Sequence, residues 1–121
     1  MKLATGVDLI EIDRIEVVLS RQGKAWLERI FTPAEQEYCG KRAESLAGRW
    51  AAKEAVAKAL GTGIGDVSWT EIEILGDEQK APRLTLYGNA ERKAKELGLT
   101  TWSISISHSQ SHSVALVVAI G

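Results

Sequence analysis

The spacing of hydrophobic residues changes several times along the first half of the chain. Residues 3–10 alternate as a half-buried strand does, and from Glu11 the apolar positions recur at helical spacing. The run Thr-Pro-Ala-Glu at 32–35 predicts a helix start with a capping box, and Gly40 predicts the end of that short helix. Residues 44–60, rich in alanine, predict a long central helix.

The second half returns to strands with one helix between them. Ser68–Leu75 alternates and Arg83–Tyr87 is a second extended run, which together predict an antiparallel pair. Asn89–Leu97 has the pattern of an amphipathic helix. Trp102–His108 alternates strictly and Val114–Ile120 is almost continuously apolar, which predicts a hairpin with Ser-Gln-Ser-His as its loop.

The order of these elements predicts an α+β fold, in which an antiparallel sheet packs against a long central helix. The length of 121 residues and the hydrophobic content of 45% fit one domain over residues 1–121. A net charge of -1 gives no overall attraction to nucleic acid or membrane. The single cysteine, the N-terminus without a signal-peptide pattern and the lack of a long apolar run predict a cytoplasmic protein.

The central helix carries the first chemical signal. Its surface is apolar or small nearly all round, which is typical of a buried helix, yet it includes Arg49, Lys53, Glu54 and Lys58. Charges on a buried helix are costly unless they are paired, extend to water or bind a ligand. One interpretation is an ion pair between Glu54 and Lys58, with the other heads in water. The other is a ligand pocket.

Asp8, at the end of the first strand, is open to two interpretations. Its carboxylate fits the N-terminus of the helix that follows, as a cap. Alternatively, Asp8 and Glu54 are two oxygen ligands for Mg²⁺, which typically takes one or two protein carboxylates and fills its other positions with water and phosphate. In that case Arg49, Lys53 and Lys58 face the same phosphates.

Two other motifs are weaker. The run Gly-Thr-Gly-Ile-Gly at 61–65 follows a helix, whereas a Walker loop precedes one, so a helix end and turn explain it. Ser107 and His108 are adjacent on a strand and point to opposite faces, which argues against a serine hydrolase. His108 alone is typical of a hydrogen-bonded residue at a strand end. No cysteine or histidine spacing indicates structural zinc.

Four blocks of the sequence, taken in this order, resemble the holo-[acyl-carrier-protein] synthases, the small 4′-phosphopantetheinyl transferases. These blocks are Gly-Val-Asp-Leu-Ile-Glu-Ile at 6–12, Phe-Thr-Pro-Ala-Glu at 31–35, Gly-Arg-Trp-Ala-Ala-Lys-Glu-Ala at 48–55 and Ser-Ile-Ser-His-Ser at 105–109. The resemblance spans essentially the whole chain. It implies transfer of 4′-phosphopantetheine from coenzyme A to a serine of apo acyl carrier protein, with Mg²⁺, in support of fatty acid biosynthesis.

The resemblance also implies roles for residues. Asp8 and Glu54 are the expected metal ligands and, with Lys58, the expected catalytic residues. Contacts to coenzyme A are expected from this set: Arg49, Lys53, Lys58, Gly61, Gly63, His108 and Ser109. Compact members of the family are trimers with the site at each subunit interface, so a homotrimer is expected.

The residues themselves agree with phosphoryl transfer, in which a protein mainly positions the reactants and neutralises charge. In this hypothesis Lys58 stabilises the departing bisphosphate, and the serine proton passes to Glu54 or to a metal-bound water. Because carrier proteins of this kind are acidic, Arg14, Arg21 and Lys24 are candidates for docking them. A non-catalytic coenzyme A or nucleotide-binding module is the main alternative, followed by an oligomerisation domain and a metal-dependent phosphohydrolase.

Overall fold

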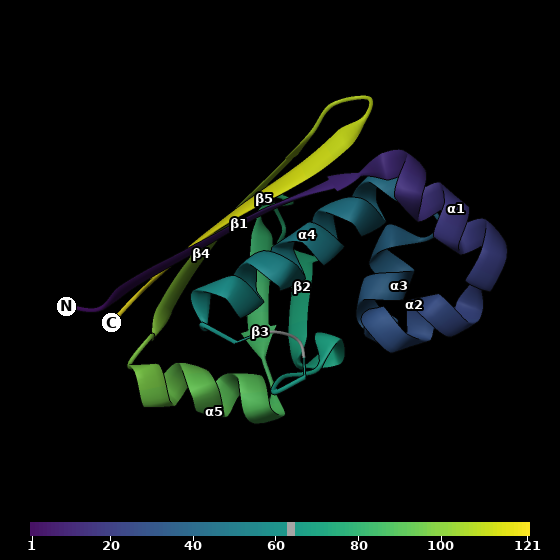
Figure 1. Cartoon of the computed structure of the whole chain (residues 1–121). Coiled ribbons are helices and arrows are strands. Elements are labelled where there is room, and N and C mark those ends of the chain that lie inside the picture. Colours follow the sequence, from purple (N-terminus) through teal and green to yellow (C-terminus); the bar gives the residue numbers. More distant parts are fainter. Residues whose placement is uncertain (63–64) are drawn as a thin grey trace.

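The structure, a computed structural model, describes residues 1–62 and 65–121. Its helices and strands alternate in an α+β order without regular βαβ repeats (Figure 1). In chain order the elements are β1 (Leu3–Glu11), α1 (Ile12–Gln22), α2 (Lys24–Ile30), α3 (Pro33–Cys39), α4 (Ala43–Ala59), the 3₁₀ turn η1 (Trp69–Glu71), β2 (Ile72–Gly76), β3 (Pro82–Leu86), α5 (Gly88–Leu97), β4 (Thr101–His108) and β5 (His112–Ile120).

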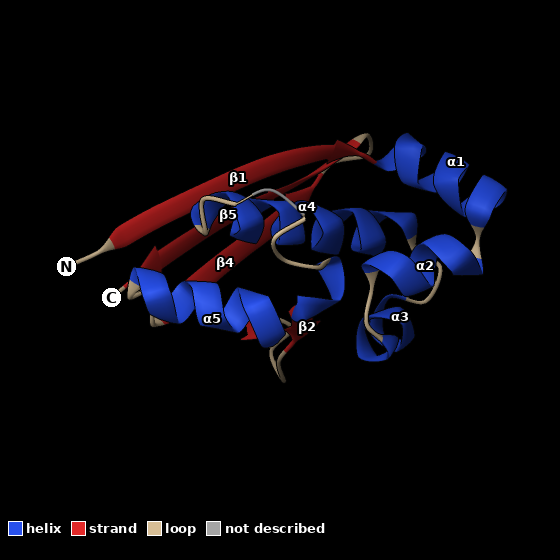
Figure 2. Cartoon of the chain, turned by 60° about the horizontal axis from the view of Figure 1, so that its bottom comes forward, coloured by secondary structure: helices blue, strands red, loops and turns tan. Residues whose placement is uncertain are grey.

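The strands form two antiparallel sheets within the described residues. One has the order β1-β5-β4 and the other is the β2–β3 hairpin. Helix α4 packs on one face of the three-stranded sheet, and Figure 2 shows α5 on the same side. The predicted fold class, the antiparallel pairs and the long central helix are confirmed. None of the described helices has the length and apolar character needed to cross a membrane.

Two strand boundaries differ from the prediction because side chains bond to the local backbone. The expected strand at 68–75 begins only at Ile72, since the Glu71 carboxylate accepts from the Ser68 amide and holds η1 as a turn. Strand β5 begins earlier than expected, at His112, because Ser109 Oγ accepts from the amides of Ser111 and His112 and tightens the hairpin.

Gly6 allows β1 and α4 to touch backbone to backbone. A methyl group placed on its Cα would overlap the carbonyl oxygen of Ala55 on α4. Glycine is required at such a contact, since any other residue would push the strand off the helix. This contact fixes the height at which Asp8, two residues further along the same face of β1, lies against α4.

Lys53, on α4, is completely buried and forms an ion pair with Glu35, whose Oε1 lies 2.7 Å from its Nζ. The ammonium also donates to the carbonyl oxygens of Trp69 (3.0 Å) and Ile72. Burial lowers the pKa of Lys53, and the charge of Glu35 opposes that effect. The fourth helix is thereby tied to η1 and β2 through one side chain.

The Glu35 carboxylate completes this connection from α3. Its Oε1 accepts from the Thr32 amide (3.0 Å) in the predicted capping box, and its Oε2 accepts from the Ile74 amide of β2 (2.8 Å). Both oxygens of the Glu35 carboxylate therefore have a donor. Such a buried pair is stable only while both partners are present.

We predict that Lys53→Met strongly destabilises the protein because it leaves the Glu35 charge buried without its partner. The expected loss is about 3–5 kcal/mol in the free energy of unfolding, measured by urea denaturation. Lys95→Met is the matched control, since Lys95 pairs with Glu91 on the surface of α5. That variant should lose less than about 1 kcal/mol. Equal losses in the two variants would contradict the prediction.

Candidate active site

Asp8 and Lys58 meet where β1 crosses the end of α4. The Asp8 side chain faces the helix and is only 14% exposed. The Lys58 Nζ lies 3.1 Å from Asp8 Oδ1 and donates to the Val7 carbonyl oxygen at 2.9 Å. The proposed cap is not formed, because Glu11 occupies the N-cap position of α1 and no side-chain cap bond is present there. The ammonium of Lys58 pairs with Asp8 rather than with Glu54.

Glu54, one turn before Lys58 on α4, has an abnormal acidity. The pKa of its carboxyl is raised from 4.5 to about 7, mainly by burial and also by a hydrogen bond to Asp8 and repulsion by Asp8. The charges of Lys58 and Arg14 oppose these effects. The structure therefore brings the two predicted carboxyl groups together at a cost that a cation would remove.

The donor set fits Mg²⁺. Asp8 Oδ2 is buried and, among the described residues, receives no hydrogen bond other than a proton that Glu54 itself would carry. A hard cation takes oxygen ligands of this kind, and Mg²⁺ needs only one or two carboxylates when water and phosphate complete its shell. No larger group of metal-ligating side chains occurs in residues 1–62 and 65–121. Asp8 and Glu54 are therefore the residues that would hold the ion.

Arg49 and His108 lie together in a separate cavity of about 250 Å³ between α3, α4 and the ends of β3 and β4. Arg49 is 9% exposed and stacks over the Tyr38 ring at 4.6 Å, and its Nε has no partner within the described parts of the chain. A buried guanidinium with a free N–H suits an anion. The cavity is lined by Tyr38, Arg42, Glu44, Ser45, Arg49, Lys80, Pro82, Ile106 and His108.

Arg42 and Lys80 add positive charge to this cavity and were missed by the sequence reasoning. Arg42 precedes α4 and donates to the carbonyl oxygens of Tyr38 and Cys39. Lys80 has a positive φ of 63° in the turn between β2 and β3. Nothing in the sequence around Lys80 distinguishes it from a lysine in an ordinary hairpin turn. The two adjacent basic residues Lys41 and Arg42, just before the predicted helix, could have indicated a positive site.

The two groups of residues lie at opposite edges of the three-stranded sheet. Asp8 is on β1 and His108 on β4, and β5 separates these strands. Both side chains face the α4 side of the sheet, according to the burial patterns of their strands. Asp8, Glu54 and Lys58 do not line the cavity of Arg49. Within the described residues, the predicted site residues therefore form two separate groups in one chain.

The remaining residues expected at coenzyme A differ in their positions. Lys53 is committed to Glu35 and two carbonyl oxygens, so its ammonium is not available to phosphates. Gly61 follows α4 with a φ of 72°, as a helix end does. Ser109 lies in the β4–β5 turn, and Gly63 lies outside the described residues.

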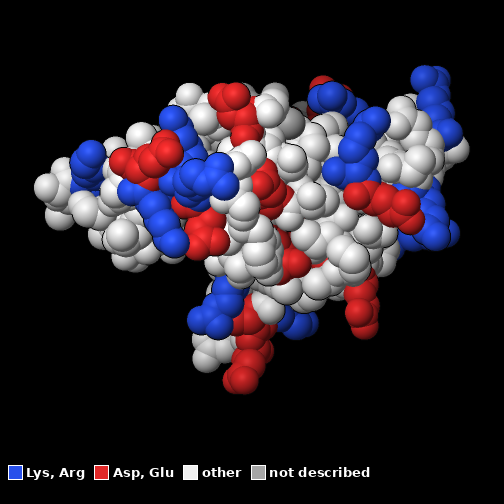
Figure 3. Space-filling model, turned by 90° about the horizontal axis from the view of Figure 1, so that it is seen from below, with Lys and Arg blue, Asp and Glu red and all other residues white. Residues whose placement is uncertain are grey.

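The docking candidates lie along α1 and at the start of α2. Arg14 stacks over the ring of Trp50 at 5.2 Å, and Lys24 pairs loosely with Glu28 on the surface. Arg21 stands in the last turn of α1. Seen from below, basic side chains lie at both ends of the molecule, the end that carries α1–α3 and the end that carries α5, with acidic ones among them (Figure 3).

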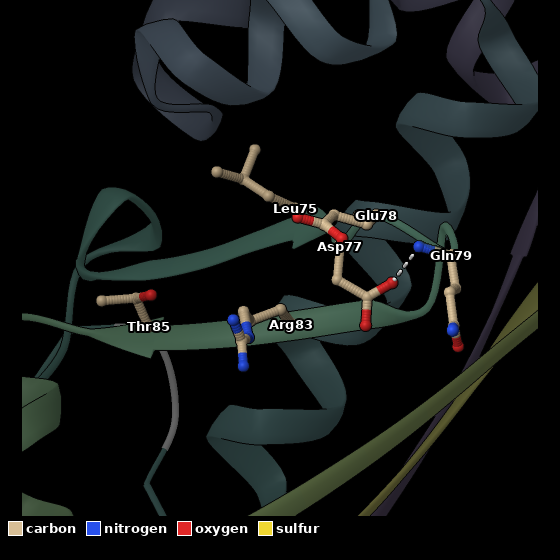
Figure 4. Close-up of a pocket in the computed structure, with 7 residues that line it drawn as sticks. Leu75, Asp77, Glu78, Gln79, Arg83 and Thr85 are labelled. Atoms are coloured by element: carbon tan, nitrogen blue, oxygen red, sulfur yellow. Dashed lines mark hydrogen bonds between the residues drawn. The ribbon is translucent and has the colours of Figure 1, made fainter.

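A further cavity of about 640 Å³ lies on the β2–β3 hairpin, away from the predicted residues (Figure 4). Its Asp77 carboxylate accepts from the amides of Gln79 and Ala81 and shapes the turn. Arg83 and Thr85 line its other side. Asp77 thus maintains the turn, and none of the residues that line this cavity is among the predicted site residues.

The fold matches that of a known class of transferases. The chain belongs to the 4′-phosphopantetheinyl transferase superfamily, whose family model matches residues 4–117. It is 50% identical to the holo-[acyl-carrier-protein] synthase of Herpetosiphon aurantiacus, over 98% of this chain and 99% of that protein.

Solved structures agree. The crystal structure of Helicobacter pylori holo-[acyl-carrier-protein] synthase in complex with coenzyme A is 36% identical, has a TM-score of 0.88 and covers 96% of this chain and 99% of that one. The enzyme from Neisseria meningitidis is also 36% identical with a TM-score of 0.88, over 98% of both chains. The family predicted from the four sequence blocks is thereby confirmed.

We predict that the stability of the metal-free protein depends on pH through Glu54. Because the folded pKa of about 7 exceeds the ordinary 4.5, the stabilisation from Glu54 is complete below that lower value and is lost as the pH rises through 7. Glu54→Gln should therefore raise the melting temperature in EDTA at about pH 8 and change it little at about pH 5. Glu37→Gln, at an exposed carboxyl of α3, should show no such difference, and a matching difference there would refute the assignment.

Proposed function

We propose that this chain transfers 4′-phosphopantetheine from coenzyme A to a serine of apo acyl carrier protein, releasing adenosine 3′,5′-bisphosphate. The observation that carries the proposal is the Asp8–Glu54 carboxyl pair, with a buried unpartnered oxygen and the Lys58 ammonium beside it. Relatives named as holo-[acyl-carrier-protein] synthases support the same reaction.

The residues divide the work of this reaction. Asp8 and Glu54 would hold Mg²⁺, which supplies charge neutralisation on the phosphates when bound. Lys58 places an ammonium at the same point and stabilises charge on the departing bisphosphate. Two acceptors fit the serine proton, the Glu54 carboxylate and a water in the site, and full activity of Glu54→Gln would exclude the first.

The direct test is the intact mass of an apo acyl carrier protein after incubation with this protein, coenzyme A and Mg²⁺. We expect a gain equal to one phosphopantetheine group, which is lost with EDTA and with Asp8→Ala. Glu37→Gln serves as a control that retains the gain. If several apo carriers gain no mass although coenzyme A binds, a non-catalytic coenzyme A-binding module replaces this proposal.

We propose that the Asp8–Glu54 group and the Arg49–His108 group are two half-sites. This division supports a homotrimer in which each complete site spans two subunits. The face of the sheet opposite α4 exposes large apolar side chains on β1 and β5, which is unusual for a surface in water. We propose that a neighbouring copy covers this face, and that the Arg49–His108 cavity of one subunit meets the carboxyl pair of the next where the edges of their sheets adjoin. The apolar side chains are Leu3, Val7, Leu9, Leu116 and Ile120.

A mixing experiment tests this arrangement. Asp8→Ala and Arg49→Ala are each expected to be inactive, whereas trimers re-formed from a 1:1 mixture should regain about a quarter of the wild-type activity, because a quarter of the interfaces join two intact halves. Asp8→Ala mixed with Glu54→Ala is the matched control and should regain none, since both lesions lie in the same half-site. No recovery in the first mixture, with subunit exchange confirmed by mass, would refute the shared site.

The acidic acceptor is proposed to dock on α1 and the start of α2. Arg14, held over Trp50, lies close enough to the carboxyl pair to oppose the rise in the pKa of Glu54, and Arg21 and Lys24 continue the positive surface. Charge complementarity of this kind speeds encounter and selects the partner. The proposed setting is the cytoplasm, with a carrier of fatty acid biosynthesis as the acceptor.

A further inference from the structure

Lys58 stands on α4 one turn after Glu54, and its side chain reaches back across β1. Its ammonium contacts Asp8 Oδ1 at 3.1 Å and the Val7 carbonyl oxygen at 2.9 Å. The two partners differ in exposure, since the Lys58 side chain is 57% exposed and that of Asp8 is 14% exposed. The Lys58 side chain therefore has room to move into solvent, whereas the Asp8 side chain is enclosed between β1 and α4.

An ammonium and a divalent cation compete for the same carboxylate lone pairs. Lys58 occupies Oδ1 of Asp8, and the second oxygen, Oδ2, has no donor among the described residues apart from the Glu54 proton. An ammonium and a divalent ion a few ångströms apart repel each other, and water at the half-exposed Lys58 weakens this repulsion without removing it. Lys58 thus has a good partner in the metal-free protein and a poor environment beside a bound ion.

We propose that Lys58 competes with the metal ion for Asp8, so that metal binding releases the ammonium from Asp8 and leaves it free to contact phosphate. This inference rests on the proposed function, in which Asp8 is a metal ligand. Binding of the metal ion and binding of phosphate are therefore coupled, because each is favoured when the Lys58 ammonium has left Asp8. In this role Lys58 controls the access of the metal ion to Asp8, in addition to its proposed contact with phosphate.

The test is Mn²⁺ binding to the free protein, followed by electron paramagnetic resonance of the unbound ion. Mn²⁺ is the probe because, like Mg²⁺, it prefers carboxylate and water ligands. Asp8→Ala should abolish binding and thereby locate the site. Lys58→Gln should tighten binding about five- to tenfold, since it removes the competitor at Asp8.

Arg14→Gln is the matched control. It removes the same unit of charge from the neighbourhood of Glu54, but its guanidinium lies over Trp50 instead of contacting Asp8. We expect it to tighten Mn²⁺ binding less than about twofold. Equal tightening in both variants would reduce the effect to a general field, and weaker binding in Lys58→Gln would mean that the lysine orients Asp8 for the ion. Either result overturns the proposal.

A second readout follows the lysine itself. At constant pH, Mg²⁺ should speed the acetylation of Lys58 by a small reagent, measured by peptide mass, while Lys95 of the surface pair with Glu91 keeps its rate. A rate at Lys58 that falls or stays constant would overturn the proposal. Neither measurement requires transfer activity, so competition can fail while the carrier protein still gains mass, and the two outcomes are distinguishable.

Discussion

The position of the carboxyl pair depends on one contact, the direct approach of β1 to α4 at Gly6. Because no side chain separates the strand from the helix there, Asp8 and Glu54 come close together, and burial together with the neighbouring Asp8 raises the pKa of Glu54 to about 7. A sheet and a helix normally stand about 10 Å apart with side chains between them. The small residues of α4 on the sheet side serve the same purpose, since they keep the helix low across the whole sheet.

The charges of α4 are spread around its axis and serve different ends. Lys53 points to α3 and β2 and holds the fold together, whereas Glu54 and Lys58 point to β1. Arg49 points to the cavity beside β4. Helix α4 therefore connects the carboxyl pair, the Arg49 cavity and one buried ion pair, and a rotation of the helix would disturb all three.

The sequence allowed the prediction of elements with strong periodicity and of residues with rare environments. The central helix, the capping box at Thr32 and the carboxyl pair all followed from local patterns and one family resemblance. The role of Lys53 was not predictable, since its partner Glu35 lies on another helix and its other acceptors are backbone oxygens. The position of Asp8 and His108 at opposite edges of the three-stranded sheet was not predictable either, because it depends on the strand order.

Lys53 and Glu54 are adjacent in sequence, yet Lys53 forms a buried ion pair and Glu54 has a proposed role in the chemistry. Genetic variation at these two codons should therefore give different phenotypes. Alleles at position 53 would reduce the amount of folded protein and become worse as the growth temperature rises. Alleles at position 54 would leave the protein abundant and fail at every temperature. A survey of conditional mutants would thus separate two neighbouring codons into different classes.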